Sequence, residues 1–381
     1  MGVTALIVVI AVMTGAKEDF QDKILDVNPH VLVLESSDNL RMGGWRPVLD
    51  SIRVVEGVVT ATPFALTKVV LARGKYGQAA DLYGIDVTSL GDAATGIEER
   101  IRSGELPLGE TESGLPPLLV GTGLADRMIV FPGDTLLLMA IENIQRDPFG
   151  GFSPTMRQFE VTGTFSTGLW DYDLANLYAH LEDVQDVMGA LDSDEISGIG
   201  VRAVDPWQAS ELEANLREAL GFPYYPESWS KTNQSLFAAL ALEKLAMWVI
   251  LFLIVVVAAF NIVSTLVMVV VDRTREIGIL KSMGMTNKGI LHVFMLQGVW
   301  IGFIGTAVGT LLGCTLSWIL DTYEIIQIPP DVYFVDRLPV ALHLSDVVLI
   351  FVASVAVAFA ATIYPALQAS RLEPVEAIRH E

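Results

Sequence analysis

The sequence predicts an α-helical membrane protein with four spans, the first truncated at its N-terminus, and a large α+β extracytoplasmic domain. Three observations predict this class. The chain of 381 residues is 52% hydrophobic. Its apolar residues gather in three uncharged stretches, 247–271, 289–320 and 347–370. Its acidic residues gather elsewhere, because residues 1–246 hold 17 lysines and arginines against 35 aspartates and glutamates.

Each uncharged stretch is long enough to cross a bilayer, which takes about 20 apolar residues. The N-terminal stretch 2–13 is shorter and allows two interpretations. It is the core of a signal peptide ending near Ala16, although no basic residue precedes it. Alternatively, it is the second half of a first span whose beginning is missing from this sequence. We favour the second interpretation.

The distribution of positive charge predicts the orientation. The connection 272–289 carries four basic and two acidic residues, and the C-terminal tail carries Arg371 and Arg379. Basic residues in short loops mark the cytoplasmic side of a membrane. The acidic region 17–231 is therefore expected on the outer side. Its charge argues against nucleic acid as a partner.

The sequence of the outer region predicts a mixture of strands and helices. One predicted loop, 142–157 (ENIQRDPFGGFSPTMR), lies between predicted strands 135–141 and 158–165. It is long for a connection in a compact domain, and such loops are often functional. We therefore expect this loop to be functional.

A lead-in helix over 232–246 is predicted to continue into the span at Met247. No glycine or proline lies between Thr232 and Val271. A continuous helix passes on a displacement that a flexible Gly/Ser linker would absorb. The sequence therefore predicts a mechanical connection between the outer domain and the membrane.

The segment 275–284 (REIGILKSMG) predicts a short amphipathic helix between two spans. Ile277, Leu280 and Met283 or Gly284 are expected on one face, and Gly284 is expected to end the helix. Such a helix lies on the inner membrane surface or docks into a groove of a soluble protein. The residues alone leave both possibilities open.

Five glycines in the predicted third span, within 289–320, follow one another at steps of three or four residues. We expect them to share one helix face and to allow close packing of spans. These glycines are Gly298, Gly302, Gly305, Gly309 and Gly313.

The sequence predicts no catalysis by this chain. It holds no GxxxxGK[ST] loop for nucleotide phosphates, and its five histidines show no metal-ligand spacing. The single cysteine, Cys314, lies in a predicted span and is interpreted as a small packing residue. We expect no metal and no cofactor in this chain.

Several motifs together resemble one family of permeases. The segments that carry the resemblance are LEK at 242–244, AAFNI at 258–262, REIGILK at 275–281, GFIGTAVGTLLG at 302–313, YPA at 364–366, PVEAIR at 374–379 and FEVTGTF at 159–165. They resemble the membrane subunits of the bacterial lipoprotein-releasing transporter, the LolC/LolE family, a branch of the MacB/FtsX-like ABC permeases. The resemblance covers essentially the whole chain.

The resemblance implies an outer domain of MacB periplasmic-core type and a location in the bacterial inner membrane. It implies two copies of a separate ABC ATPase, which bind ATP and Mg, and a second permease subunit, identical or paralogous. The further partners it implies are a triacylated lipoprotein and a periplasmic lipoprotein carrier. ATP-driven closure of the ATPases would push on the cytoplasmic helix.

The resemblance also assigns site residues. The ATPase-coupling helix would comprise Arg275, Glu276, Ile277, Leu280, Lys281, Met283 and Gly284. A carrier-binding hook, used by only one of the two paired paralogues, would comprise Ile144, Arg146, Pro148, Phe149, Phe152, Pro154 and Arg157. The lipoprotein cavity would include Val255, Ala259, Phe260 and Ile262.

Two alternatives remain within the superfamily. One is a MacB-like efflux permease, which usually carries its ATPase in the same chain. The other is an FtsX-like regulator of a periplasmic cell-wall hydrolase. The expected order is the remainder of span 1 at 1–16, outer domain 17–231, lead-in helix and span 2 at 232–271, coupling helix 272–289, span 3 at 290–320, outer loop 321–346, span 4 at 347–370 and inner tail 371–381.

Overall fold

The structure is a computed structural model of the chain. It describes residues 1–37, 41–73, 76–86, 95–104, 111, 113–146, 152–323 and 338–372. The chain forms two compact units. Of the described residues, 1–19, 238–323 and 338–372 form the unit that we call the helical unit, and 20–237 form the unit that we call the α+β domain.

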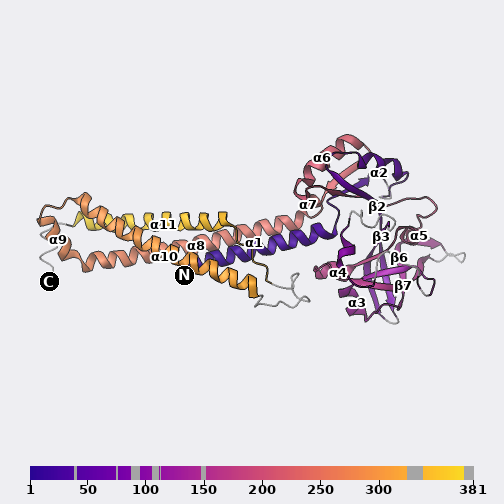
Figure 1. Cartoon of the computed structure of the whole chain (residues 1–381), viewed down its shortest axis with the longest axis horizontal. Helices are drawn as coiled ribbons and strands as arrows, with labels where there is room; N and C mark the ends of the chain where they lie inside the picture. The colour runs from indigo at the N-terminus through magenta and orange to yellow at the C-terminus, as the bar shows by residue number, and fades with distance from the viewer. Residues whose placement is uncertain are drawn as a thin grey trace. The chain divides into compact units, whose positions relative to one another are not determined.

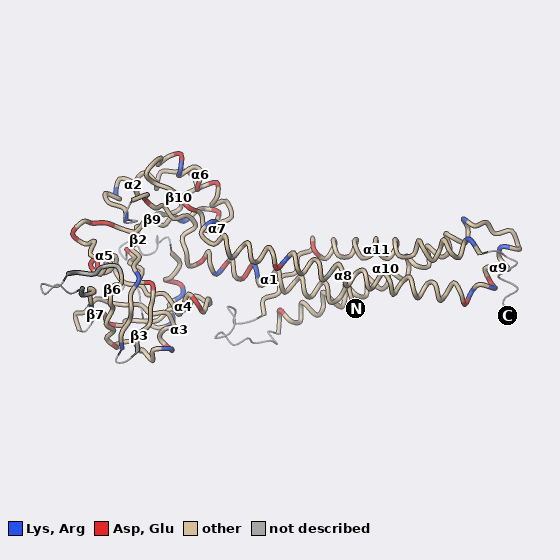
Figure 2. The backbone as a smooth tube through the Cα atoms, turned by 180° about the vertical axis from the view of Figure 1, so that it is seen from behind, with Lys and Arg blue, Asp and Glu red and all other residues tan. Residues whose placement is uncertain are grey.

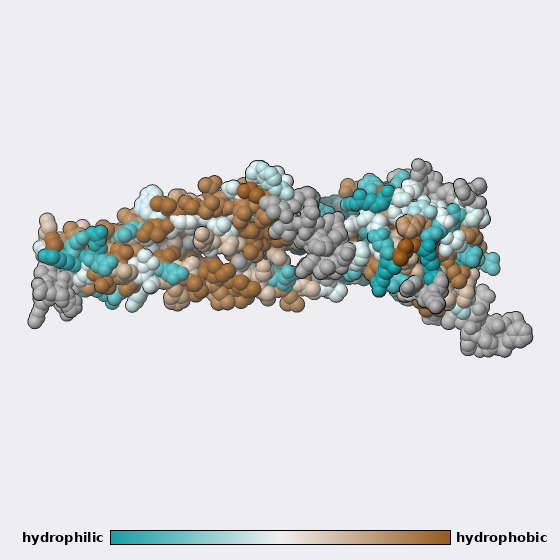
Figure 3. All heavy atoms as spheres, turned by 90° about the horizontal axis from the view of Figure 1, so that it is seen from below, coloured by the Kyte–Doolittle hydropathy of each residue, from teal (hydrophilic) through white to brown (hydrophobic). Residues whose placement is uncertain are grey.

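Four long helices lie side by side in the helical unit (Figure 1). They are α1 (Gly2–Val27), α8 (Gln234–Asp272), α10 (Asn287–Tyr323) and α11 (Leu344–Arg371), and the short α9 (Thr274–Ser282) connects α8 to α10. Among the described residues, α8, α10 and α11 are long and apolar enough to cross a membrane. Apolar side chains cover most of their visible surface (Figure 3).

Small residues bring α10 close to its neighbours. A Cβ atom at Gly302 would lie 2.5 Å from Cβ of Ala358 in α11, and Gly298 faces Thr362. Farther along α10, Gly309 and Gly313 face Val3 and Ile7 of α1, respectively. The four glycines thus allow close approach of two different helices.

Gly305 departs from the expected shared face. Nothing lies within 4 Å of a Cβ atom placed there, whereas the next residue, Thr306, is buried. An α-helix has 3.6 residues per turn, so the buried row advances from Gly302 to Thr306 and then to Gly309. Gly305 falls outside this row, and the prediction for it was wrong.

The segment before α11 lies against α1. The backbone N–H of Ala341 donates to the carbonyl of Ala11 at 2.9 Å. A Cβ atom at Gly15 would lie 2.7 Å from the backbone of Pro339, so only glycine allows this approach. His343 and Glu18 extend the contact, with 2.7 Å between imidazole Nε2 and carboxylate Oε1.

The first part of the α+β domain is an antiparallel sheet covered by helices. Its strand order is β10 (Tyr224–Ser228), β1 (Val31–Glu35), β9 (Gly198–Ala203) and the first half of β2 (Val58–Arg73). The amphipathic helices α2 (Trp45–Arg53) and α6 (Ala209–Leu220) place their apolar faces in the same core as these strands. We call this part the helix-covered sheet.

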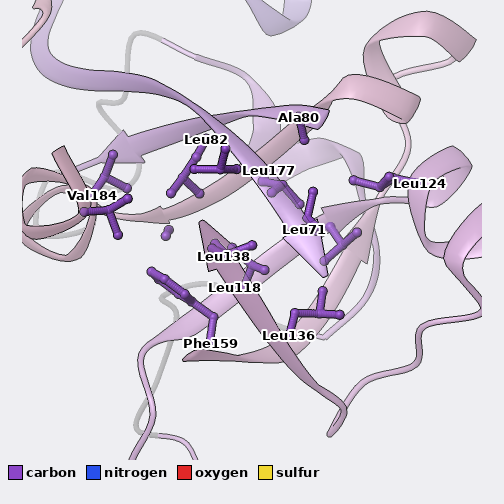
Figure 4. Packing of buried hydrophobic residues seen from close by; sticks show 14 of the residues in the cluster. Leu71, Ala80, Leu82, Leu118, Leu124, Leu136, Leu138, Phe159, Leu177 and Val184 are labelled. Atoms are coloured by element: carbon purple, nitrogen blue, oxygen red, sulfur yellow. The ribbon is translucent and has the colours of Figure 1, made fainter. Parts of the chain in front are cut away.

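The second part is a closed barrel. The second half of β2 pairs with β3 (Tyr76–Ile85), and the circuit continues through β8 (Asn176–His180), β5 (Pro117–Gly121), β7 (Phe152–Phe165) and β6 (Thr135–Arg146) back to β2. Leucines from these strands, among them Leu71, Leu138 and Leu177, point toward one another inside it (Figure 4). Closure removes the free edges that an open sheet would expose.

The remaining elements complete the domain. The strand β4 (Ile101–Ser103) pairs with β7. The short helices are η2 (Ile97–Arg100), α3 (Thr122–Met128), α4 (Trp170–Ala175), α5 (Leu181–Met188), η3 (Pro206–Gln208) and α7 (Trp229–Thr232). The long β2 belongs to both parts, since Val58–Phe64 pairs with β9 and Phe64–Arg73 pairs with β3.

The loop predicted over 142–157 is largely a β-hairpin. β6 extends to Arg146 and β7 begins at Phe152, with Ile144 opposite Pro154. The strands continue because backbone N–H and C=O groups gain partners by pairing. Residues 147–151, with Pro148 and Phe149, lie outside the described residues.

Candidate functional site

The short helix α9 is defined by its two ends. At its start, the guanidinium of Arg273 donates to both carboxylate oxygens of Glu276, at 2.5 and 2.7 Å. At its end, Gly284 has a φ of +99°, which favours glycine. The N–H groups of Gly284 and Met285 donate to the carbonyls of Lys281 and Leu280 there. Gly284 therefore lies just past the end of α9, as the sequence predicted for this glycine.

One face of α9 packs onto the spans. Ile277 is 3% exposed and lies in a cluster with Ile290 and Phe294 of α10 and Ala366 and Ala369 of α11. Gly278 is also buried. This face holds α9 against the ends of two apolar helices.

The other face of α9 is open and apolar. Leu280 is 43% exposed and Met283 is 79% exposed. Ile279, which the sequence analysis missed, is 45% exposed beside them. The apolar residues expected on one face are thus divided, because Ile277 is buried against α10 and α11 whereas Leu280 and Met283 are exposed. We call Glu276, Ile279, Leu280 and Met283 the open face of α9.

Two charged residues of α9 have different surroundings. Arg275 is exposed. Lys281 instead points to α11, where its ammonium donates to the carbonyls of Ser370 and Leu372, each at 2.7 Å. Charged residues occur along the chain around α9, whereas the apolar lengths of the long helices contain few (Figure 2). Lys281 is thus part of the contact with α11 and not of the open face.

The start of α8 is anchored in the α+β domain. Trp229 is buried, and its indole N–H donates to the carbonyl of Pro206 at 2.8 Å. Its ring contacts the rings of Trp207 and Phe237, with centroids 5.7 and 5.2 Å away. Aromatic packing of this kind holds the segment before α8, together with its first residues, in the α+β domain.

A buried carboxylate strengthens this anchor. The side chain of Glu213 in α6 is 4% exposed and accepts hydrogen bonds from Lys231 and Arg217 and from the backbone N–H of Ser228. Burial raises the pKa of Glu213, but the bonds from Lys231 and Ser228 outweigh it, so that the pKa is lowered. The charged form is therefore the one that the fold stabilises.

The end of α1 is anchored differently. Val27 is fully buried with Leu119, Phe165 and Tyr178 of the barrel. Ile24 lies in the core of the helix-covered sheet. The last turns of α1 therefore contact both parts of the α+β domain.

A network of hydroxyl groups lies beside this end of α1. The hydroxyl of Tyr172 donates to the Asn28 side-chain oxygen at 3.3 Å and accepts the 2.8 Å hydrogen bond that it shares with the hydroxyl of Tyr178. Burial raises the pKa of both phenols well above the usual value, so they stay neutral. Neutral, hydrogen-bonded phenols fit a structural role here.

The proposed hook has a defined base. Arg157 is not at its tip; the guanidinium pairs with Asp186 and Asp183 of α5, at 3.4 Å for Asp183. Burial raises the pKa of Asp183, and Arg157 partly opposes this. Ile144, Arg146 and Phe152 lie in the paired strands of the hairpin. Arg157 thus fixes the hairpin to the barrel.

The residues expected at a lipid cavity do not all share one face of α8. Val255, Ala259 and Ile262 are half-buried, at steps of four and three residues. Phe260 is 69% exposed. Adjacent positions on a helix differ by about 100°, so Phe260 points away from the row that contains Ala259. The four residues are thus divided between two sides of α8, and the lipid cavity stays a prediction.

The described residues contain no group of His, Cys, Asp and Glu that could hold a metal ion. Cys314 is half-buried beside Leu6, Ile7 and Ile350. This apolar setting is typical of a packing residue.

Two family models match the chain. A MacB-like periplasmic core domain matches residues 1–219, and an FtsX-like permease C-terminal domain matches residues 248–374. The first match identifies the α+β domain as a large extracytoplasmic domain. The solved periplasmic region of MacB from Actinobacillus actinomycetemcomitans matches at 14% identity over 57% of this chain and 97% of that chain, with a TM-score of 0.34.

Relatives match over the full length of the chain. The lipoprotein-releasing system transmembrane protein LolC of Neisseria meningitidis serogroup B is 33% identical over 100% of this chain and 92% of its own. LolC of Xylella fastidiosa Temecula1 is 32% identical with the same coverage. LolE of Haemophilus influenzae is 27% identical over 99% of this chain and 91% of its own. The chain therefore belongs to the LolC/LolE family of lipoprotein-releasing system transmembrane proteins, within the MacB/FtsX-like permeases.

Proposed function

We propose that this chain is the permease subunit of an ABC transporter that releases lipoproteins from the outer leaflet of the bacterial inner membrane. A separate ATPase, present in two copies, would bind ATP and Mg and hydrolyse the ATP. A second permease, identical or paralogous, would complete the complex. The released triacylated lipoprotein would pass to a periplasmic carrier.

The open face of α9 is the observation that carries this proposal. Leu280 and Met283 expose apolar surface at a point where the chain turns between two apolar helices. Exposed apolar helix faces of this kind dock into hydrophobic grooves of partner proteins. Glu276 and Arg275 beside them supply charge for orienting a partner. The family to which the chain belongs supports an ATPase as that partner.

Movement would pass from α9 to the outer domain through α8. This helix has no break from Gln234 to Asp272, and the aromatic and ionic contacts of Trp229 and Glu213 hold the segment before it. The apolar part of α1 would contribute to a first span, which gives four spans in total. The β6–β7 hairpin is the proposed hook for the carrier.

The surface of α8 supports an apolar cargo. Phe252, Val257 and Phe260 are each more than half exposed along it. A charge-free surface suits acyl chains, which gain no hydrogen bonds from a protein. Val255, Ala259 and Ile262 would line the other side of this region.

Depletion of the protein in its host tests the proposal. We expect mature lipoproteins to accumulate in the inner membrane, because their release would stop. Normal arrival of lipoproteins at the outer membrane would contradict the proposal. Purification of the complex distinguishes the alternatives, since a bound cell-wall hydrolase in place of a lipoprotein carrier indicates the FtsX-like function.

A direct test uses the purified complex in proteoliposomes loaded with a triacylated lipoprotein. ATP and the soluble carrier are expected to move the lipoprotein into the supernatant. Omission of ATP, or of the carrier, is the matched control. Export of small molecules without lipoprotein release would indicate the MacB-like efflux function instead.

A further inference from the structure

The side chain of Lys281 in α9 binds the end of α11 and does not extend from the open face. Its ammonium donates to the carbonyls of Ser370 and Leu372 at 2.7 Å each. These carbonyls belong to the end of α11, and Lys281 is separated from them by the whole of α10 in sequence. The contact therefore joins two elements that the chain itself does not join directly.

The chemistry of a helix end explains the contact. The last four carbonyls of an α-helix have no partner within the helix. A cation near that end binds these carbonyls and interacts favourably with the negative end of the helix dipole. Lys281 supplies this cation from α9. Its two hydrogen bonds therefore join α9 to α11, which a capping residue within α11 would not do.

Apolar packing supports the connection on the same side. Ile277 is one turn before Lys281 and lies in one cluster with Ala366 and Ala369 of α11. Ser370 is itself 5% exposed. The contact between α9 and α11 thus combines a buried apolar patch with two charge-assisted hydrogen bonds.

The helix α11, which Lys281 contacts, packs in turn against α10. Gly298 and Gly302 of α10 face Thr362 and Ala358 of α11 so closely that their Cβ atoms would overlap them. α10 and α11 therefore share a tightly packed interface that resists sliding. A displacement of α11 at its Lys281 end is expected to move α10 with it.

We propose that Lys281 is a positioning residue that latches the coupling helix to the fourth span. A push on the open face of α9 then reaches α11 and α10 as well as α8. This inference rests on the proposed function, because the push comes from the partner ATPase. In this inference, the open face of α9 contacts the ATPase, whereas Lys281 passes the displacement of α9 on to α11.

The test compares four variants of the full chain in complex with its ATPase. Lys281→Met keeps the aliphatic stem and removes the donor groups, whereas Lys281→Arg keeps a cation with donors. Lys288→Met removes an exposed lysine nearby as the matched control. Leu280→Asp alters the open face and is the reference for lost docking.

Lys281→Met is expected to co-purify with the ATPase and to keep its basal ATP hydrolysis. ATP-dependent lipoprotein release is expected to fall about tenfold, the usual range of a coupling effect. Lys281→Arg is expected to restore release, and Lys288→Met to leave it unchanged. Unchanged release in Lys281→Met, or loss of the ATPase as in Leu280→Asp, would overturn the latch.

A second measurement does not depend on the cargo. Amide hydrogen exchange in the last turns of α11 is compared with and without ATP and vanadate. The latch predicts an ATP-dependent change in the wild-type complex that Lys281→Met abolishes; equal changes in both contradict it. If the wild-type complex releases no lipoprotein, the proposed function fails while the exchange result still decides the latch.

Discussion

Ile277 and Leu280 lie three positions apart in α9, yet Ile277 is 3% exposed and Leu280 is 43% exposed. The helix therefore has a buried and an exposed apolar surface. The buried surface packs α9 against α10 and α11, and the exposed surface is the one that we propose binds the ATPase.

Substitutions on these two surfaces are expected to have different consequences. Leu280→Asp or Met283→Asp should abolish binding of the ATPase and leave the folded chain intact, because both side chains are exposed. Ile277→Asp should destabilise the end of the helical unit by several kcal/mol, since it buries an unpaired charge. Co-purification measures the first effect and thermal unfolding in detergent the second. ATPase binding by Leu280→Asp at the wild-type level would contradict the assignment.

The glycines of α10 provide a prediction with an internal control. Gly302→Ala should destabilise the α10–α11 contact by about 1–3 kcal/mol, because its Cβ would lie 2.5 Å from Cβ of Ala358. Gly305→Ala should be neutral or slightly stabilising, since the site is open and alanine favours helix. Hydrogen exchange in α10 and α11 measures the difference. Equal effects of the two substitutions would exclude close packing at Gly302.

The anchor at Glu213 should respond to acid. Its lowered pKa means that the folded state favours the carboxylate. The stabilisation is present above the ordinary value of 4.5 and is lost as the pH falls through the lowered pKa. Glu213→Gln should remove about 2 kcal/mol at neutral pH and flatten the acid dependence. Glu218 is exposed on the same helix, and Glu218→Gln should change neither the free energy of unfolding nor its dependence on acid pH. Urea unfolding, followed by a spectroscopic signal of the α+β domain, measures both.

Ile129 is held in an unfavourable backbone conformation. It follows α3 with φ and ψ of 55° each, a region that β-branched residues rarely occupy. Arg73 donates to its carbonyl and to that of Met128, which helps to keep the turn in place. Ile129→Gly should therefore stabilise the domain by about 1 kcal/mol, and Ile129→Ala by less. Thermal unfolding measures both, and destabilisation by glycine would contradict the explanation.

Arg157 should control the protonation of Asp183. The pKa of Asp183 is raised by burial and held down in part by Arg157. Arg157→Met should raise the pKa of Asp183 further and lower the free energy of unfolding by on the order of 1 kcal/mol near neutral pH. A raised carboxyl pKa favours the protonated folded state, so the variant should lose stability as the pH rises through that pKa. Carboxyl NMR titration checks this, with Arg127→Met as the control; an unchanged or lower pKa of Asp183 would exclude the role of Arg157.

Periodicity in the sequence could indicate the amphipathic nature of α9 but not the assignment of its faces. Ile277, Ile279, Leu280 and Met283 are all apolar, and at about 100° per residue they lie within one arc of about 160°. Contacts with α10 and α11, whose residues are distant in sequence, decide that only the Ile277 end of this arc is buried. Ile279 was missed for the same reason.

The long apolar helices were predictable because their uncharged stretches extend over entire spans. The barrel was not, since its closure depends on β6 pairing with both β2 and β7. Pairing between distant strands leaves little local trace in a sequence. The hairpin was mistaken for a loop because its prolines and glycines are typical of turns.

The closed barrel also has an evolutionary consequence. Its hydrogen-bonded circuit is complete without the far end of the β6–β7 hairpin, since β2 contacts β6 only over Leu137–Ala140. Residues beyond this contact can therefore change in sequence without loss of the barrel's hydrogen-bonded circuit. One scaffold can thus present different segments at the end of this hairpin.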